Sequence, residues 1–98
     1  MRRAAKIDAN QPEIVNALRR AGATVQSLAA VGAGCPDLLV GYANKTALIE
    51  VKDGSKVNSA QKLRPMQSDW HGNWTGGMLA VVNDVEGALR VLNVMTTN

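Results

Sequence analysis

The sequence predicts a single α/β domain in which helices flank a mixed four-stranded sheet. Three observations lead to this fold class. Four short apolar segments are typical of strands, while amphipathic segments near the two ends of the chain are typical of helices. The two clearest strands are apolar on both faces for most of their length, which indicates cover on two sides. A chain of 98 residues has room for one hydrophobic core, so we expect residues 1–98 to form one domain.

The first predicted helix begins at Asn10, a suitable N-cap, with Glu13 three residues later as its capping-box partner. Gly22 ends this helix. Its apolar side chains recur at helical spacing, namely Ile14, Ala17, Leu18 and Ala21. A first strand is expected over residues 24–30, followed by a glycine-rich turn over residues 31–36.

The next two strands are expected over residues 37–42 and 47–52, joined by a hairpin turn over residues 43–46. The polar and basic segment 53–64 has no periodicity and predicts a loop. A loop of this length is unusual in a compact domain and points to a functional role.

A second helix is expected from Pro65, which suits a first helical position, to about Asn73. Gly76 and Gly77 then break the chain, and residues 78–82 form a fourth strand. Asp84 caps a last helix. The apolar stripe of this helix consists of Val85, Ala88, Leu89 and Leu92.

Composition limits the classes of protein that remain. Eleven Lys and Arg against eight Asp and Glu give a net charge of +3 and a pI near 9.4, which suits a polyanionic partner but equally a solvated surface. The single cysteine, Cys35, excludes an intramolecular disulfide and a cysteine-based zinc site, and without a histidine partner it is a turn-packing residue rather than a nucleophile. No apolar run reaches the ~18 residues of a membrane span, and the first residues lack the apolar stretch of a signal peptide. We therefore expect a cytoplasmic protein.

The predicted hairpin brings charged residues together. Centring the turn on residues 44–45 places Asp37 opposite Lys52 and Leu39 opposite Glu50. The charged side chains then share one face of the sheet, and the two carboxylates are diagonal neighbours with Cβ atoms within about 7–8 Å. This depends on the register, because a turn of odd length would put the carboxylates on opposite faces.

Two carboxylates at this separation can hold one hard cation, Mg²⁺ or Mn²⁺, which prefers oxygen ligands and keeps several waters. The backbone carbonyl of Val51 would lie close enough to add a ligand. Lys52 can orient or deprotonate a water and stabilise charge that develops on a phosphate. These parts suit metal-assisted phosphodiester hydrolysis. The ordinary alternative is a cross-strand ion pair of Asp37 with Lys52 that has no catalytic role.

Two segments resemble the signature of the PD-(D/E)xK nucleases. They are Gly34-Cys35-Pro36-Asp37-Leu38-Leu39-Val40-Gly41 and Leu48-Ile49-Glu50-Val51-Lys52. The expected element order also resembles the restriction-endonuclease-like αβββαβ core of that superfamily, from about Asp8 to the last helix. Within it, the chain is most similar to small stand-alone phage and bacterial nucleases of the VRR-NUC and Holliday-junction-resolvase-like type.

The resemblance implies roles for matching positions. Asp37 and Glu50 would bind the catalytic Mg²⁺ or Mn²⁺, and Lys52 would position the attacking water. Glu13 would complete the metal site, although its capping role is the structural alternative. Gln67, in the helix after the Glu-x-Lys strand, would hold a water or a phosphate beside the site, unless it is an ordinary surface residue.

Basic residues are candidate contacts to the DNA backbone, and most of them lie in or next to the loop that leaves from Lys52. They are Lys56, Lys62, Arg64 and Arg3. A solvated loop is the structural alternative. Arg64 stands where relatives often have Thr or Ser as the cap before Pro65. Because an arginine side chain cannot accept a backbone N–H, this helix start needs another cap.

Other residues are assigned structural roles. His71 has no second His or Cys at ligand spacing, so it is not expected to bind a metal. Trp70 and Trp74 fall on one helix face and are expected in the core or a dimer interface rather than stacked on bases. Gly32 and Gly34 lack a following Gly-Lys-Ser/Thr, so they are expected to allow close approach of backbone to the metal site rather than to bind phosphate.

The sequence thus predicts a metal-dependent DNA endonuclease, and the resemblance suggests branched DNA, such as a Holliday junction, as its substrate. A homodimer is expected from the small core and from the two-fold symmetry of a junction. One alternative is a catalytically silent DNA-binding or scaffold module on the same fold, with salt-dependent binding and no cleavage. A second is a helix-turn-helix regulator over residues 10–30, which is disfavoured because residues 25–31 lack a polar, base-reading face.

Overall fold

The computed structural model describes residues 7–97, except for the side chains of residues 59 and 60. The elements of this part of the chain are α1 (Gln11–Arg20), β1 (Thr24–Ser27), β2 (Leu38–Tyr42), β3 (Lys45–Val51), α2 (Asn58–Gln61), α3 (Pro65–Asn73), β4 (Met78–Val82) and α4 (Val85–Met95). The strands form one sheet in the order β1-β2-β3-β4. The first two pairings are antiparallel and β3–β4 is parallel, which confirms the predicted α/β fold with a mixed four-stranded sheet.

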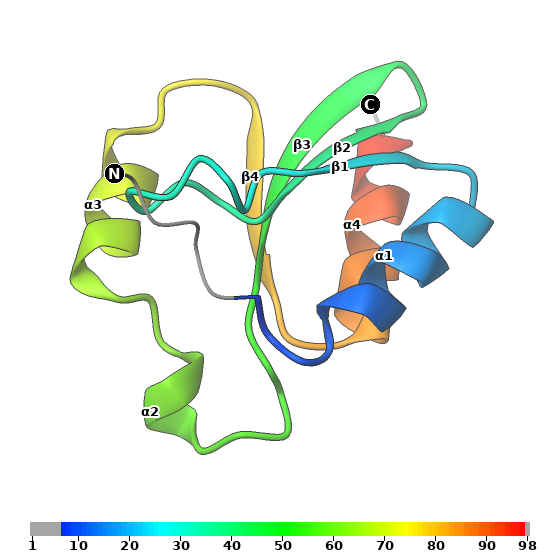
Figure 1. Cartoon of the computed structure of the whole chain (residues 1–98). Coiled ribbons are helices and arrows are strands. Elements are labelled where there is room, and N and C mark those ends of the chain that lie inside the picture. The colour runs from blue at the N-terminus through cyan, green and yellow to red at the C-terminus, as the bar shows by residue number, and fades with distance from the viewer. Residues whose placement is uncertain (1–6, 98) are drawn as a thin grey trace.

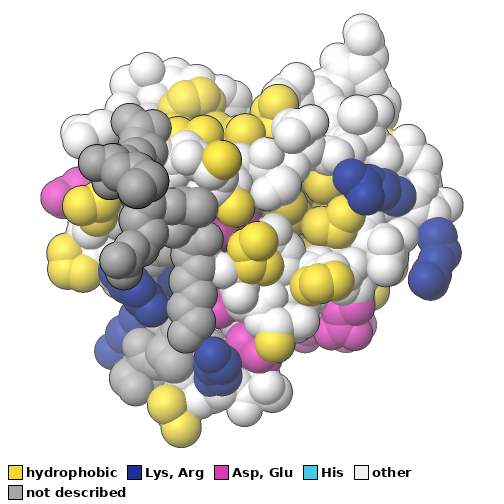
Figure 2. Space-filling view, viewed as in Figure 1, with side chains coloured by type: hydrophobic (Ala, Val, Ile, Leu, Met, Phe, Trp, Pro, Cys, Tyr) yellow, Lys and Arg dark blue, Asp and Glu magenta, His cyan; other side chains and the backbone are white. Residues whose placement is uncertain are grey.

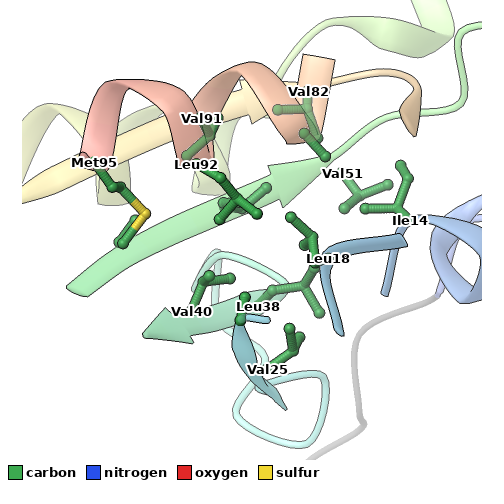
Figure 3. Packing of buried hydrophobic residues seen from close by; sticks show 14 residues of the cluster. Ile14, Leu18, Val25, Leu38, Val40, Val51, Val82, Val91, Leu92 and Met95 are labelled. Carbon is green, nitrogen blue, oxygen red and sulfur yellow. The ribbon is translucent and has the colours of Figure 1, made fainter. Parts of the chain in front are cut away.

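The hydrophobic core lies between the sheet and one pair of helices. Figure 1 shows the sheet nearly edge-on, with α1 and α4 on one side and α3 on the other. The fully or almost fully buried apolar residues come from α1, α4 and the sheet face that points toward them. They include Ile14, Leu18, Leu38, Val40, Ile49, Val51, Leu92 and Met95, most of which are labelled in Figure 3. Because side chains alternate along a strand, the residues between them in β2 and β3 point toward α3.

Cover on the α3 side of the sheet is only partial. Leu39 and Val81 on this side are 38% and 49% exposed, and α3 itself buries none of its residues. The predicted cover on two sides is therefore present, but it is less complete on this side. The helix is short and lacks an apolar stripe, so it approaches the sheet mainly through polar side chains.

The hairpin between β2 and β3 has a different register from the predicted one. Its turn is centred on Ala43 and Asn44, whose φ angles of 51° and 63° are typical of a tight two-residue hairpin turn. Leu38 therefore pairs with Ile49, which moves the predicted pairing by two residues. A shift of two residues leaves every side chain on its expected face, because the side-chain period of a strand is two.

The helices α1 and α4 begin where the sequence predicts, but only one of the two predicted capping hydrogen bonds forms. Asn10 precedes α1 as expected, but it makes no capping hydrogen bond. Its Nδ2 instead donates to the carbonyls of Lys52 and Asn83, 3.1 Å away in each case. The predicted capping box with Glu13 is therefore wrong, since the Asn10 side chain ties the start of α1 to the ends of β3 and β4. Asp84 caps α4 as predicted, accepting from the Gly87 N–H at 2.7 Å.

Two further expectations need correction. The first strand ends at Ser27 instead of residue 30, and the expected loop 53–64 contains the single helical turn α2. Of the two places expected for Trp70 and Trp74, the core is excluded, since they stack on each other outside the core cluster with ring centroids 5.1 Å apart, and the dimer interface stays a prediction. Since residues 24–27 are a strand, the helix-turn-helix alternative is excluded. Within residues 7–97, the helices are too short or too polar to span a membrane.

Candidate active site at the carboxyl end of β3

Three charged residues are buried together where β2 begins and β3 ends. Asp37 directly precedes β2, Glu50 is the next-to-last residue of β3, and Lys52 directly follows it. Antiparallel pairing brings the start of β2 to the end of β3, and the observed register sets Asp37 opposite Glu50 rather than opposite Lys52. The three residues are only 7%, 1% and 5% exposed. Charged groups buried this deeply need partners.

The two carboxylates raise each other's energy. Burial raises the pKa of Glu50 to about 8, and the neighbouring charge of Asp37 adds to the rise. Burial also raises the pKa of Asp37, although a hydrogen bond from the Val51 N–H to its Oδ2, 2.7 Å long, acts in the opposite direction. The pair therefore retains a proton at neutral pH.

Gln67 connects the site to α3. Its Oε1 accepts from the Lys52 Nζ at 2.8 Å and from the Arg64 N–H at 2.9 Å, and its Nε2 donates to Glu50 Oε2 at 3.0 Å. The Lys52 Nζ lies 3.8 Å from the same Glu50 oxygen. Gln67 thus orients the lysine and the carboxylate, and it also satisfies the backbone N–H of Arg64 at the start of α3.

We expect Gln67→Ala to destabilise the protein by about 1–3 kcal/mol, because it leaves the buried Lys52 ammonium without its closest partner. Chemical denaturation with a matched Ser68→Ala variant measures this effect, since Ser68 is an exposed neighbour on the same helix. Equal stabilities of the two variants would contradict the structural role assigned to Gln67.

The donor set of the site fits a hard divalent cation. Asp37 and Glu50 supply oxygen ligands, and the buried Glu50 Oε1 has no hydrogen-bond partner among the described residues. A cation beside the two carboxylates would favour their ionised forms and so offset the effect of burial, which raises the pKa of both. Mg²⁺ commonly binds through one or two carboxylates and completes its shell with water and phosphate. These two residues are therefore the ones that would hold it.

The structure does not bring Glu13 into this arrangement. Glu13 is exposed and lines a separate shallow pocket together with Asp53 and Asp84. Among the residues that the structure describes, no three His, Cys, Asp or Glu side chains are grouped to hold a metal, so Glu13 does not complete such a group. The Val51 N–H donates to Asp37 Oδ2, so Val51 lies beside the pair, and its carbonyl stays a predicted ligand.

Two residues near the carboxylates were not predicted. The Nε2 of His71 lies 3.9 Å from Glu50 Oε1, and burial lowers the pKa of this imidazole, helped by the charge of Lys52. The second is Asp8, whose charge raises the pKa of both carboxylates. The spacing of Gln67 and His71, four residues apart on one helix, is the signal that could have identified the histidine.

The predicted DNA-binding residues that the structure describes are all exposed. Lys56, Lys62 and Arg64 are exposed, while Arg3 lies outside the described residues. In Figure 2, the visible Lys and Arg side chains form separate groups at the left and right of the view. A hollow of about 220 Å³ beside Lys52 adds one cation that was not predicted from the sequence, Arg90 of α4.

Gly34 serves packing between the loop before β2 and α3. Its φ of 83° suits glycine, and a Cβ there would lie 2.3 Å from the Met66 carbonyl oxygen. The close approach predicted for this glycine is thus an approach to the start of α3, which helps to hold Gln67 and His71 over the carboxylates.

In comparisons with known proteins, the chain matches no protein-family model, no curated protein and no solved structure. Function must therefore be inferred from the site itself.

Proposed function

We propose that the protein is a metal-dependent DNA endonuclease that hydrolyses phosphodiester bonds. The observation that carries this proposal is the buried carboxylate pair Asp37–Glu50 with the Lys52 ammonium beside it. Burying two carboxylates that repel each other lowers the stability of the folded protein. Ionisable groups with strongly shifted pKa values cluster at functional sites. A bound Mg²⁺ or Mn²⁺ would supply charge stabilisation for a phosphate and acidify a water.

Each residue of the site has a separate role in this proposal. Asp37 and Glu50 hold the cation through carboxylate oxygens. Lys52 positions the attacking water and stabilises negative charge on the phosphate. Gln67 keeps the Lys52 Nζ in place through its 2.8 Å hydrogen bond, so that the ammonium need not be reoriented during the reaction.

The DNA substrate is proposed from charge and from the resemblance to junction-cleaving nucleases. Lys56, Lys62 and Arg64 follow the site along the chain, and their exposed side chains can reach phosphates of a bound strand. Branched DNA is the proposed substrate, and a homodimer would present two sites to a two-fold junction. Light scattering at working concentration tests the dimer, which a purely monomeric mass would exclude.

We expect Lys62→Ala to weaken DNA binding uniformly across sequences and to reduce the slope of log K against log salt by roughly 0.9. Arg20→Ala is the matched control, since Arg20 is an exposed cation on α1, on the opposite side of the sheet. Binding titrations at several salt concentrations measure both slopes. If the two variants lose the same affinity, the segment after Lys52 does not contact DNA.

Cleavage of end-labelled four-way-junction, flap and linear duplex DNA tests the proposed function. The reactions are run with Mg²⁺, with Mn²⁺ and with a chelator. We expect cleavage only with a divalent cation and preferentially on the branched substrates. Binding without cleavage under all of these conditions would overturn the nuclease assignment.

A catalytically silent DNA-binding module is the second candidate. It is favoured by one observation, that the described residues supply two carboxylates but no third ligand of the His, Cys, Asp or Glu type. Such a module would bind branched DNA with a steep salt dependence and would not require a divalent cation. The same assay separates the two functions.

A further inference from the structure

His71 is the only histidine of the chain, and it lies one helical turn after Gln67 on α3. Its side chain is 11% exposed, and its Nε2 has no hydrogen-bond partner within residues 7–97. The nearest carboxylate oxygen, Glu50 Oε1, is buried and equally without a partner in that range. Two buried polar atoms without hydrogen-bond partners destabilise the folded protein, unless a third group forms a hydrogen bond with each of them.

The distance between the two atoms indicates what that group is. A separation of 3.9 Å is beyond the reach of a direct hydrogen bond, but one water can bridge it. Buried waters commonly occupy such places between polar groups. Direct coordination of a cation by His71 is disfavoured, because the described side chains do not form a group of three ligands. The ring is also packed edge-on against Trp70, with centroids 6.3 Å apart.

We propose that His71 is a positioning residue that holds one water against Glu50 Oε1 and thereby orients this carboxylate for cation binding. The inference rests on the proposed function, since it concerns the same site. Gln67 already fixes the other oxygen, Oε2, at 3.0 Å. With both oxygens held from one face of α3, Glu50 is fixed before the cation arrives, and partners of this kind typically change metal affinity roughly 10–100-fold.

Calorimetric titration of the full chain with Mn²⁺ tests the effect on affinity. We expect His71→Ala to raise the Kd for Mn²⁺ by about 10-fold or more. His71→Gln, whose amide can still bond a water, should restore most of that loss. Asn73→Ala, at an exposed position on the same helix, should not change the Kd. Thermal unfolding of each variant shows that the comparison is made between folded proteins.

Electron spin echo spectroscopy of the Mn²⁺ form tests how His71 acts. Because the chain has one histidine, imidazole nitrogen coupling can come only from His71 in protein freed of any affinity tag. We expect no coupling of a directly bound nitrogen, together with a shift of the His71 ring resonances on Mg²⁺ addition.

Each result has a distinct meaning. A directly bound nitrogen would overturn the water-mediated role. An unchanged Kd in His71→Ala, with Mn²⁺ bound normally by the parent, would overturn the positioning role and leave the proposed function intact. Absence of Mn²⁺ binding by the parent chain would overturn both.

Discussion

Replacing Glu50 by glutamine should strongly reduce metal-dependent cleavage and, in the same protein, raise stability at pH 8 in the absence of metal. Glutamine keeps the size of the side chain and an oxygen that can accept from Gln67, but it removes the charge that a cation requires. Cleavage should fall on the order of 10²–10³-fold or more, as when one electrostatic partner of a transition state is lost.

The gain in stability follows from the cost of the buried charge. At pH 8 the unfolded chain carries an ionised Glu50, whereas in the folded protein the same group is desolvated and repelled by Asp37. Removing this cost should stabilise by on the order of 1 kcal/mol or more, which is roughly 4–8 °C in Tm for a domain of this size. Near pH 4 the parent is protonated in both states, so the difference should shrink.

Glu86→Gln is the matched control for this prediction. Glu86 is an exposed carboxylate on α4 whose contact to Arg90, at 3.8 Å, lies on the surface. It should leave cleavage and stability nearly unchanged. A Glu50→Gln protein that still cleaves DNA would remove Glu50 from the site. A variant that loses both activity and stability at every pH would assign Glu50 a structural role only.

The element order and the buried charges could be predicted from the sequence, because each depends on local signals. Pro65 at the first position of α3 and Asp84 before α4 act within a few residues of their own position. Glu50 and Lys52 stand out as charges at the end of an otherwise apolar strand. Such residues can be recognised from the sequence alone, without knowing which strand pairs with theirs.

Contacts that depend on tertiary geometry could not be predicted in the same way. The register of the hairpin is set by Ala43 and Asn44 adopting positive φ, and alanine gives no sign of this. Asn10 has the properties of a cap, yet two carbonyls at the ends of β3 and β4 compete successfully for its amide. His71 approaches Glu50 only because α3 lies over the end of β3. The periodicity of apolar residues within a strand or a helix does not predict such a contact between elements.

The stability of the metal-free protein is expected to fall as the pH rises from about 4.5 to about 8. The pKa of a glutamate side chain is ordinarily 4.5, whereas that of Glu50 in the folded protein is about 8, so over this interval the unfolded chain loses a proton that the folded protein keeps. Folding then takes up a proton, and each increase in pH disfavours it. Above about 8 this contribution is constant. The raised pKa of Asp37 acts in the same direction from a lower pH, starting at 3.8.

The contribution of His71 to stability depends on pH in the opposite direction. Burial lowers its pKa from 6.5, so this contribution to stability is lost as the pH falls below that value. The Glu50→Gln variant separates the two groups, since it should keep the histidine contribution and lose most of the decline toward pH 8. Thermal unfolding of both proteins with a chelator, at pH values from about 4.5 to about 9, provides the comparison. A parent profile that is flat or rises across this interval would contradict the shared-proton carboxylate pair.

Divalent cations should counteract the loss of stability at higher pH, because they bind the Asp37–Glu50 pair when it is ionised and not when it is protonated. At a concentration about 100 times the Kd, a ligand of the folded state adds ~2.7 kcal/mol, and that full gain requires both carboxylates to be ionised. The Tm increase caused by Mg²⁺ or Mn²⁺ should therefore grow from about pH 5.5 to about pH 8.5 and be absent in Glu50→Gln. A cation effect independent of pH, or retained in that variant, would place the bound ion elsewhere on the molecule, for example in the pocket lined by Glu13, Asp53 and Asp84.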